Sequence, residues 1–207
     1  MTERQIACDR LVIATGPWIP LTFTTLFPES GLEIPIHAEK GSYSLLFELM
    51  ADDITRDDSR STSVSVSTGG PSTQLMHRSD GRFHSAVALP AKIAFPDCAA
   101  ELDALAQRDE LVQLEARIRT MLAVPVEIRQ RQICFNPATK STIPIMARVP
   151  SVVLHQEAAH NAGDSGVYIV GGHGFWGVTA ALGSGKLTAQ LVLGLPLDIS
   201  LDKYGLG

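Results

Sequence analysis

The feature that most limits the fold of this chain is an apolar run, a glycine-rich turn and an amphipathic segment in direct succession near its C-terminal end. Val167-Tyr168-Ile169-Val170 leads into Gly171-Gly172-His173-Gly174-Phe175-Trp176-Gly177. A short continuous apolar run of this kind predicts a strand buried on both faces. A helix is expected from about Val178 to Leu193, because Gly194 suits the residue after a helix and Pro196 prevents continuation. The segment predicts a strand–turn–helix unit.

The turn of this unit, Gly172–Gly177, satisfies the pattern G-x-G-x-x-G between a strand and a helix, which is typical of dinucleotide binding. The first N–H groups of the helix have no partner within it, so an electron-rich group is favoured beside them. A nicotinamide cofactor is one interpretation, with Asp198 near the place of the ribose acid. His173, Phe175 and Trp176 are bulky for a pyrophosphate cradle. The simplest alternative is that the glycines only allow the strand and helix to pack closely.

A second apolar run, Leu11-Val12-Ile13-Ala14, ends in Thr15-Gly16-Pro17 and predicts another buried parallel strand that leads into a turn. A strand buried on both faces needs neighbours, and the few residues before it cannot supply them. We therefore expect this chain to start in the middle of a fold.

The middle of the chain combines strand and helix patterns. Residues 34–49 predict a strand pair or one long strand bent around Gly41, and residues 62–67 predict a half-buried strand. Asp80-Gly81 predicts a hairpin turn. One long helix is expected from Cys98 to Leu122 with Asp97 as its N-cap. Further strands are expected at 126–135 and 151–154, with a loop at 137–144. The fold class is α/β with mixed α+β character.

The composition excludes several classes of protein. The formal net charge of −5 argues against nucleic acid as the main partner, and the 207 residues contain no apolar run long enough for a membrane span. Cys8, Cys98 and Cys134 form no CxxC pair, so no zinc site or disulfide framework is indicated and no metal is expected. A reducing, cytoplasmic location fits these cysteines best.

Three segments resemble the D-amino-acid-oxidase-type (DAO) family of FAD-dependent oxidoreductases, in a fungal-like branch. Residues 9–18, Asp-Arg-Leu-Val-Ile-Ala-Thr-Gly-Pro-Trp, resemble the family pattern D-x-V-V-x-A-x-G-x-W. Residues 133–145 resemble C-x-R-P-x-T-x-D-x-x-P-I. Residues 166–186 resemble the family's G-V-Y-x-x-x-G-H-G-x-W-G strand and final helix. Their order and spacing also fit the family.

The resemblance implies an oxidoreductase with an incomplete Rossmann-like FAD-binding domain at 1–20 and 150–207, and a mixed β-sheet substrate domain with helices at 21–149. It implies FAD as the cofactor and hydride transfer from a C–H bond next to an amine to flavin N5, with reoxidation by oxygen. The substrate would be a small amine or amino-acid-like molecule. The implied cofactor-binding residues are Thr15, Gly16, Trp18, Gly172, His173, Gly174, Phe175, Trp176, Gly177, Val178 and Thr179. No catalytic side chain is assigned.

The chain also departs from the family pattern. The N-terminal ADP-binding unit has no counterpart, so an N-terminally truncated chain, or one that needs a complementing half, is expected. Asn136 occupies the place of a substrate-binding arginine, and it supplies a neutral amide instead of a charged, bidentate group. Ser141 and Ala147 replace an Asp and a Gly. A catalytically inactive fragment or relative of the family is the alternative function.

Overall fold

The fold is taken from a computed structural model of the chain, which describes residues 6–50, 62–66, 73–88, 93–108, 115–116, 118–122, 124–154 and 165–206. The chain divides into two compact units. Unit 1 comprises residues 1–39 and 136–207, and unit 2 comprises residues 40–135. The predicted assignment of a flavin-binding and a substrate domain stays a prediction. In the described part of the chain, no helix is both long and apolar enough to cross a membrane.

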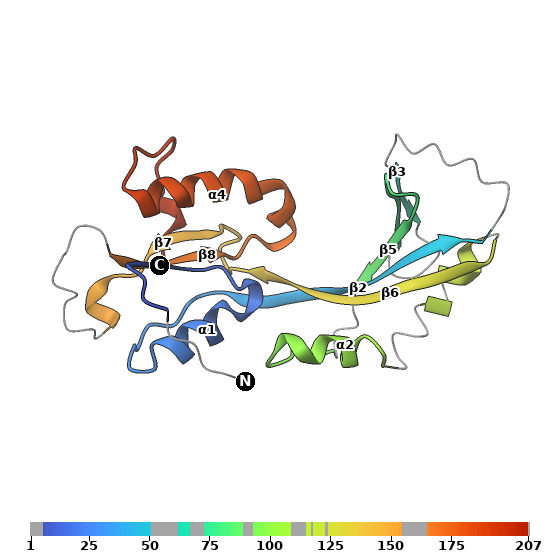
Figure 1. The fold of residues 1–207 in the computed structure, drawn as a ribbon, viewed down its shortest axis with the longest axis horizontal. Helices are drawn as coiled ribbons and strands as arrows, with labels where there is room; N and C mark the ends of the chain where they lie inside the picture. The colour runs from blue at the N-terminus through green and yellow to red at the C-terminus, as the bar shows by residue number, and fades with distance from the viewer. Residues whose placement is uncertain are drawn as a thin grey trace. The chain divides into compact units, whose positions relative to one another are not determined.

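Unit 1 is built on a three-stranded sheet in the order β1-β8-β7 (Figure 1). Strands β1 (Arg10–Ile13) and β8 (Gly166–Gly171) are parallel, with Ile13 opposite Ile169. Strand β7 (Ile145–Arg148) is antiparallel to β8. The predicted parallel strand at residues 11–14 is confirmed, but its predicted burial on both faces is wrong, since Val12 is 41% exposed.

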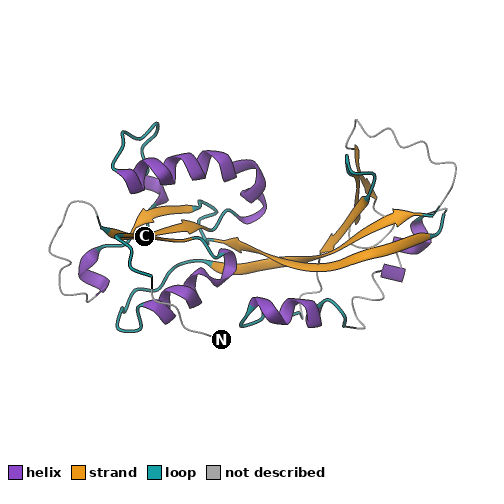
Figure 2. Ribbon diagram, in the orientation of Figure 1, coloured by secondary structure: helices purple, strands orange, loops and turns teal. Residues whose placement is uncertain are grey.

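Helices cover both faces of this sheet (Figure 2). Helix α1 (Ile19–Leu26) follows β1 after a 3-10 turn, η1 (Gly16–Trp18), and its Ile19 and Phe23 are fully buried in the main apolar cluster with Ile13 and Ile169. Helix α4 (Gly177–Leu193) packs on the other face through Ser184 and Thr188. Its end is the one predicted: Gly194 is left-handed, with φ 68°.

Unit 2 contains a sheet in the order β3-β4-β5-β2-β6. Its strands are β2 (His37–Leu49), β3 (Thr62–Val66), β4 (Thr73–His77), β5 (Phe83–Ala88) and β6 (Val126–Ala138), and β2 and β6 also extend into unit 1. The predicted hairpin joins β4 to β5, with Gly81 at φ 78°. Tyr43, Leu45 and Phe47 on one face of β2 form the centre of the apolar core.

Glu115 lies within this unit as a buried carboxylate between two arginines. Its Oε1 accepts from Arg119 Nε and Nη2, and its Oε2 lies 2.9 Å from Arg131 Nε. Only 8% of the Glu115 side chain is exposed. The pairing ties residues 115–121, which are helical where they are described, to strand β6.

Four local predictions are wrong. The expected helix from Cys98 to Leu122 is interrupted: a 3-10 turn, η2 (Ala99–Glu101), and helix α2 (Leu102–Leu105) come first, and a turn follows at Ala106, where the apolar stripe is least regular. Asp97 is not the cap, because Cys98 precedes η2. Residues 151–154 form a 3-10 helix, η3 (Ser151–Leu154), instead of the predicted strand. The loop predicted at residues 137–144 begins later than expected, because strand β6 continues to Ala138.

Candidate functional site

Two strand–turn–helix junctions lie side by side in unit 1. Strands β1 and β8 are adjacent and parallel, so their carboxyl ends and the turns that follow lie at the same edge of the sheet. Helix α1 begins from the first turn and helix α4 from the second, on opposite faces (Figure 1). The structure therefore brings together the two turns that the sequence predicts as binding elements.

The backbones of the two turns are nearly the same. A left-handed glycine opens each 3-10 turn, Gly16 with φ 61° and Gly174 with φ 55°. A tryptophan ends each turn, Trp18 at φ −86°, ψ 4° and Trp176 at φ −89°, ψ 4°, and each is the N-cap residue of the helix that follows. The 3-10 turn at the second junction is η4 (Gly174–Trp176). The shared geometry explains why glycine opens both turns, since a left-handed φ favours glycine.

Position 172 requires glycine for two reasons, its backbone conformation and the close approach of a neighbouring side chain. Its φ is 80°, and a β-carbon built there would lie 2.7 Å from Cγ2 of Thr139. Thr139 is held in place because its Oγ1 donates to the carbonyl of Ile143 over 2.8 Å. A larger residue at position 172 would push the turn away from the segment after β6.

His173 joins the turn to the body of α4. Its Nε2 lies 2.8 Å from Oγ of Ser184, which is buried, and its backbone forms an isolated antiparallel bridge with Ala138. Burial lowers the pKa of His173 below its ordinary value of 6.5, because the charged imidazolium loses solvation. The neutral imidazole is therefore the form that the fold favours near pH 7.

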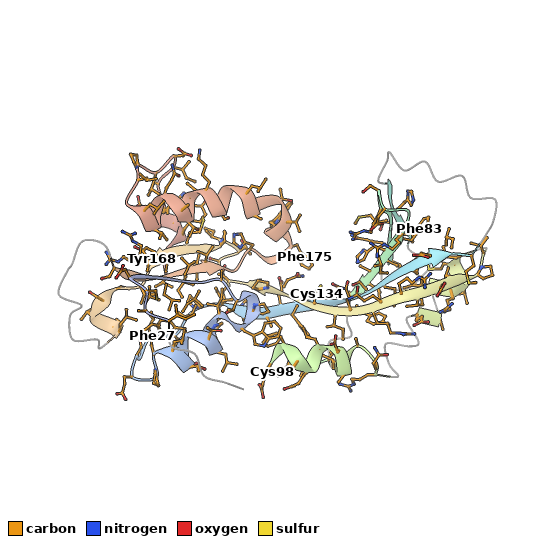
Figure 3. The ribbon with its side chains drawn as sticks, in the orientation of Figure 1. Phe27, Phe83, Cys98, Cys134, Tyr168 and Phe175 are labelled. Carbon is orange, nitrogen blue, oxygen red and sulfur yellow. The ribbon has the colours of Figure 1, made fainter. Side chains whose placement is uncertain are left out.

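The residues that follow His173 are exposed and largely apolar. Phe175 is 71% exposed, Trp176 70% and Val178 94%, and Thr179 is also exposed. Figure 3 labels Phe175 where α4 begins. Neither His173 nor Trp176 caps its helix with a side-chain hydrogen bond, and the first turn of α4 carries no acidic residue. Uncapped N–H groups beside exposed aromatic rings suit a flat, electron-rich ring system.

The first turn has hydrogen bonds of its own at this edge. Thr15 Oγ1 hydrogen-bonds Thr22 Oγ1 over 2.9 Å, and the Trp18 N–H donates to the Thr15 carbonyl over 3.2 Å. Thr15 is exposed, whereas Gly16 and Trp18 are half-buried. A β-carbon at Gly16 would meet nothing within 4 Å, so its requirement for glycine comes from φ alone.

Asn136, the predicted substrate residue, lies on β6 two residues before the bridge between Ala138 and His173. It is half-buried. Asp198, considered for a ribose, instead has both its carboxylate oxygens engaged by α4: Lys186 Nζ approaches Oδ2, and Gln190 Nε2 donates to Oδ1 over 3.2 Å. These bonds lower the pKa of Asp198, the Lys186 bond first.

Sequence reasoning missed Ser184, Thr139 and Thr22 as supports of this site. Ser184 stands in Gly183-Ser184-Gly185-Lys186, which fails as a P-loop and so carries no other signal. A small polar residue between two glycines on a largely apolar helix is the only hint. No group of three or more His, Cys, Asp or Glu side chains that could hold a metal occurs among the described residues.

Comparison with known proteins identifies the class. The sequence profile of the FAD dependent oxidoreductase (DAO) family matches residues 1–191, so the chain belongs to this family. Members of the family bind FAD. No curated protein sequence matches the chain.

Solved structures share the fold at low identity. Iminodiacetate oxidase from Chelativorans sp. BNC1 aligns over 98% of this chain and 47% of its own, with 21% identity and a TM-score of 0.60. Glycine oxidase from Geobacillus kaustophilus aligns over 97% and 46%, with 17% identity and a TM-score of 0.58. L-amino acid deaminase from Proteus vulgaris aligns over 95% and 51%, with 16% identity and a TM-score of 0.55. The chain spans about half the length of these relatives.

Proposed function

We propose that this chain forms the flavin-contacting part of an FAD-dependent amine or amino-acid oxidase. The observation that carries the proposal is the uncapped start of α4 beside the exposed rings of Phe175 and Trp176. Family membership favours FAD over a nicotinamide cofactor at this turn. When bound, the flavin would supply the chemistry, accepting a hydride from a C–H bond next to an amine.

The chain's own residues would bind and orient that cofactor. The N–H groups at Gly177, Val178 and Thr179 would face its electron-rich edge, where the positive end of the helix dipole stabilises negative charge. Phe175 and Trp176 would cover apolar ring surface and exclude water. Gly172 and Gly174 allow the backbone to approach closely, and Thr15, Gly16 and Trp18 would contact the cofactor from the neighbouring turn.

Asn136 would shape the choice of substrate. Its amide offers one neutral donor group and one acceptor, whereas an arginine at this place would offer a charged, bidentate partner for a carboxylate. We propose that the substrate carries an uncharged group here. Iminodiacetate oxidase and glycine oxidase, two of the structural relatives, support an amine or amino-acid-like substrate.

A complementing polypeptide would complete the flavoprotein, either a further N-terminal segment or a separate chain. The relatives are about twice as long as this chain, β1 is an edge strand of the described sheet, and Val12 on β1 is 41% exposed. We also propose that the protein is located in the cytoplasm.

The proposal is tested by titrating the purified chain with FAD while following flavin absorbance and fluorescence. Flavin bands that co-purify, or saturable quenching on titration, are expected. Phe175→Ala should weaken binding about tenfold, by analogy with the loss of one aromatic stacking contact, whereas Leu193→Ala is the matched control, an exposed apolar residue at the other end of α4. A chain that never takes up FAD would overturn the proposal as an activity of this polypeptide.

The second candidate function is that of a catalytically inactive relative of the family. A purified chain without flavin absorbance would favour it. The specific observation behind that candidate is the neutral Asn136 in a chain about half the length of its relatives. An FAD-loaded protein that fails to reduce its flavin with any amine or amino acid would support it.

A further inference from the structure

The side chain of His173 is directed into unit 1, away from the exposed residues that follow it. Its ring is half-buried, whereas Phe175 and Trp176 are 71% and 70% exposed. The ring atom farthest from the backbone, Nε2, is the one that meets Ser184 Oγ, at 2.8 Å. An imidazole engaged at its tip beneath the turn is poorly placed to react with a ligand above the turn.

Ser184 is a firm anchor for this contact. It lies on the second turn of α4, and only 7% of its surface is exposed. The bond between residues 173 and 184 therefore links the turn to a part of the helix that is fixed by packing on the sheet.

The backbone of His173 is fixed by two further contacts. It pairs with Ala138 at the end of β6, and its carbonyl accepts from the Trp176 N–H over 3.0 Å, which closes the 3-10 turn. One residue thus joins the end of β6, the 3-10 turn and the buried face of α4. The flanking Gly172 and Gly174, with φ 80° and 55°, supply little stiffness of their own.

We propose that His173 is a positioning residue, which holds the N–H groups at the start of α4 in place for the flavin through its bond to Ser184. The inference rests on the proposed function for its ligand, but the hydrogen bond between His173 and Ser184 is present in the chain without cofactor. His173 would thus support the cofactor site without contacting the reacting atoms.

The first test is hydrogen–deuterium exchange of the amides at 172–179 in the chain without FAD. His173→Asn and Ser184→Ala should each raise their exchange rate about tenfold, the usual effect of one buried hydrogen bond. His173→Gln should stay near the wild type, because the glutamine amide reaches the position of Nε2 and the asparagine amide does not. The double variant should exchange no faster than the faster single variant, since both remove one interaction.

Thr188→Val is the matched control, because it removes a buried hydroxyl from the same face of α4 without touching the turn. An equal rise in exchange in Thr188→Val would mean that the variants act by lowering the stability of α4 as a whole. That result would overturn the proposal. Exchange unchanged in Ser184→Ala would overturn it as well.

The second test measures the dissociation constant of FAD in the same variants. Ser184→Ala and His173→Asn should weaken binding about tenfold and Thr188→Val should not. If the variants exchange faster but bind FAD as tightly as the wild type, the proposal that His173 positions the N–H groups for the flavin is overturned. A wild-type chain that does not bind FAD would sink the proposed function instead, and the exchange test would still decide whether His173 positions the turn.

Discussion

Trp18 and Trp176 have the same backbone conformation at the ends of two neighbouring turns, with φ −86° and −89° and ψ 4° in both. Each lies two residues after a left-handed glycine and directly before a helix. Because β1 and β8 are parallel neighbours, the equivalence places two similar helix entries at one edge of the sheet. It is the structural basis for treating both turns as parts of one site.

This equivalence predicts equal costs for the two glycines. Gly16→Ala and Gly174→Ala should each lower the free energy of unfolding by roughly 1–2 kcal/mol, because both residues have positive φ and both have room for a β-carbon. Gly183→Ala, in the middle of α4 with open space around it, should raise stability by up to about 1 kcal/mol. Urea unfolding checks all three, and unequal losses at Gly16 and Gly174 would contradict the shared geometry.

Gly172→Ala should be more damaging than Gly174→Ala. Both positions have positive φ, but only at Gly172 does a β-carbon meet a side chain closely, Cγ2 of Thr139 at 2.7 Å. The excess loss should be about 1–3 kcal/mol, as for overpacking. Thr139→Ser removes that methyl group and keeps the hydroxyl bonded to Ile143, so the double variant should recover most of the excess. No recovery in urea unfolding would show that the backbone alone makes the difference.

Glu115→Gln should lower the free energy of unfolding by about 3 kcal/mol, because it leaves Arg119 and Arg131 without their buried carboxylate. The matched control is Glu127→Gln. Glu127 also pairs with an arginine, Arg129, but 47% of its side chain is exposed, so its loss should cost less than about 1 kcal/mol. Equal effects of the two substitutions would contradict a role for burial.

Stability should fall as the pH drops below about 6.5, and His173 and His84 should account for much of that fall. Burial lowers the pKa of both, with Arg78 as a second cause for His84. The unfolded chain therefore binds more protons than the folded chain between the lowered pKa values and 6.5, so acid favours unfolding in this window. Urea unfolding at pH 7.5, 6.5 and 5.5 measures the slope.

His173→Gln and His84→Gln should each flatten this pH dependence. The carboxyl groups of Asp80 and Asp198 also have lowered pKa values, but their contribution to stability is lost only in more acidic solution, around and below their ordinary value of 3.8. A slope between pH 7.5 and 5.5 that is the same in both variants as in the wild type would contradict this assignment.

Much of the local structure was predictable from the sequence. The runs before residues 15 and 171 predicted the strands that became β1 and β8, and Gly194 predicted the end of α4. The Asp80-Gly81 pair predicted the hairpin. The continuous helix expected over residues 98–122 was wrong, since a turn interrupts it at Ala106, whose side chain is buried to 1% exposure in the core of unit 2.

The sequence by itself determined the strand–turn–helix units, because backbone preference of glycine, apolar periodicity and helix ends act over a few neighbouring residues. Only the tertiary structure decided which distant groups support the turns: Ser184 beneath His173, and Thr139 against Gly172. Those contacts require α4 to pack on the sheet of unit 1, and the segment at the end of β6 to lie against the glycine turn. Side-chain partners that are far apart in sequence are set by that packing, whereas the conformations of the two Gly-x-Trp turns follow from the residues within them.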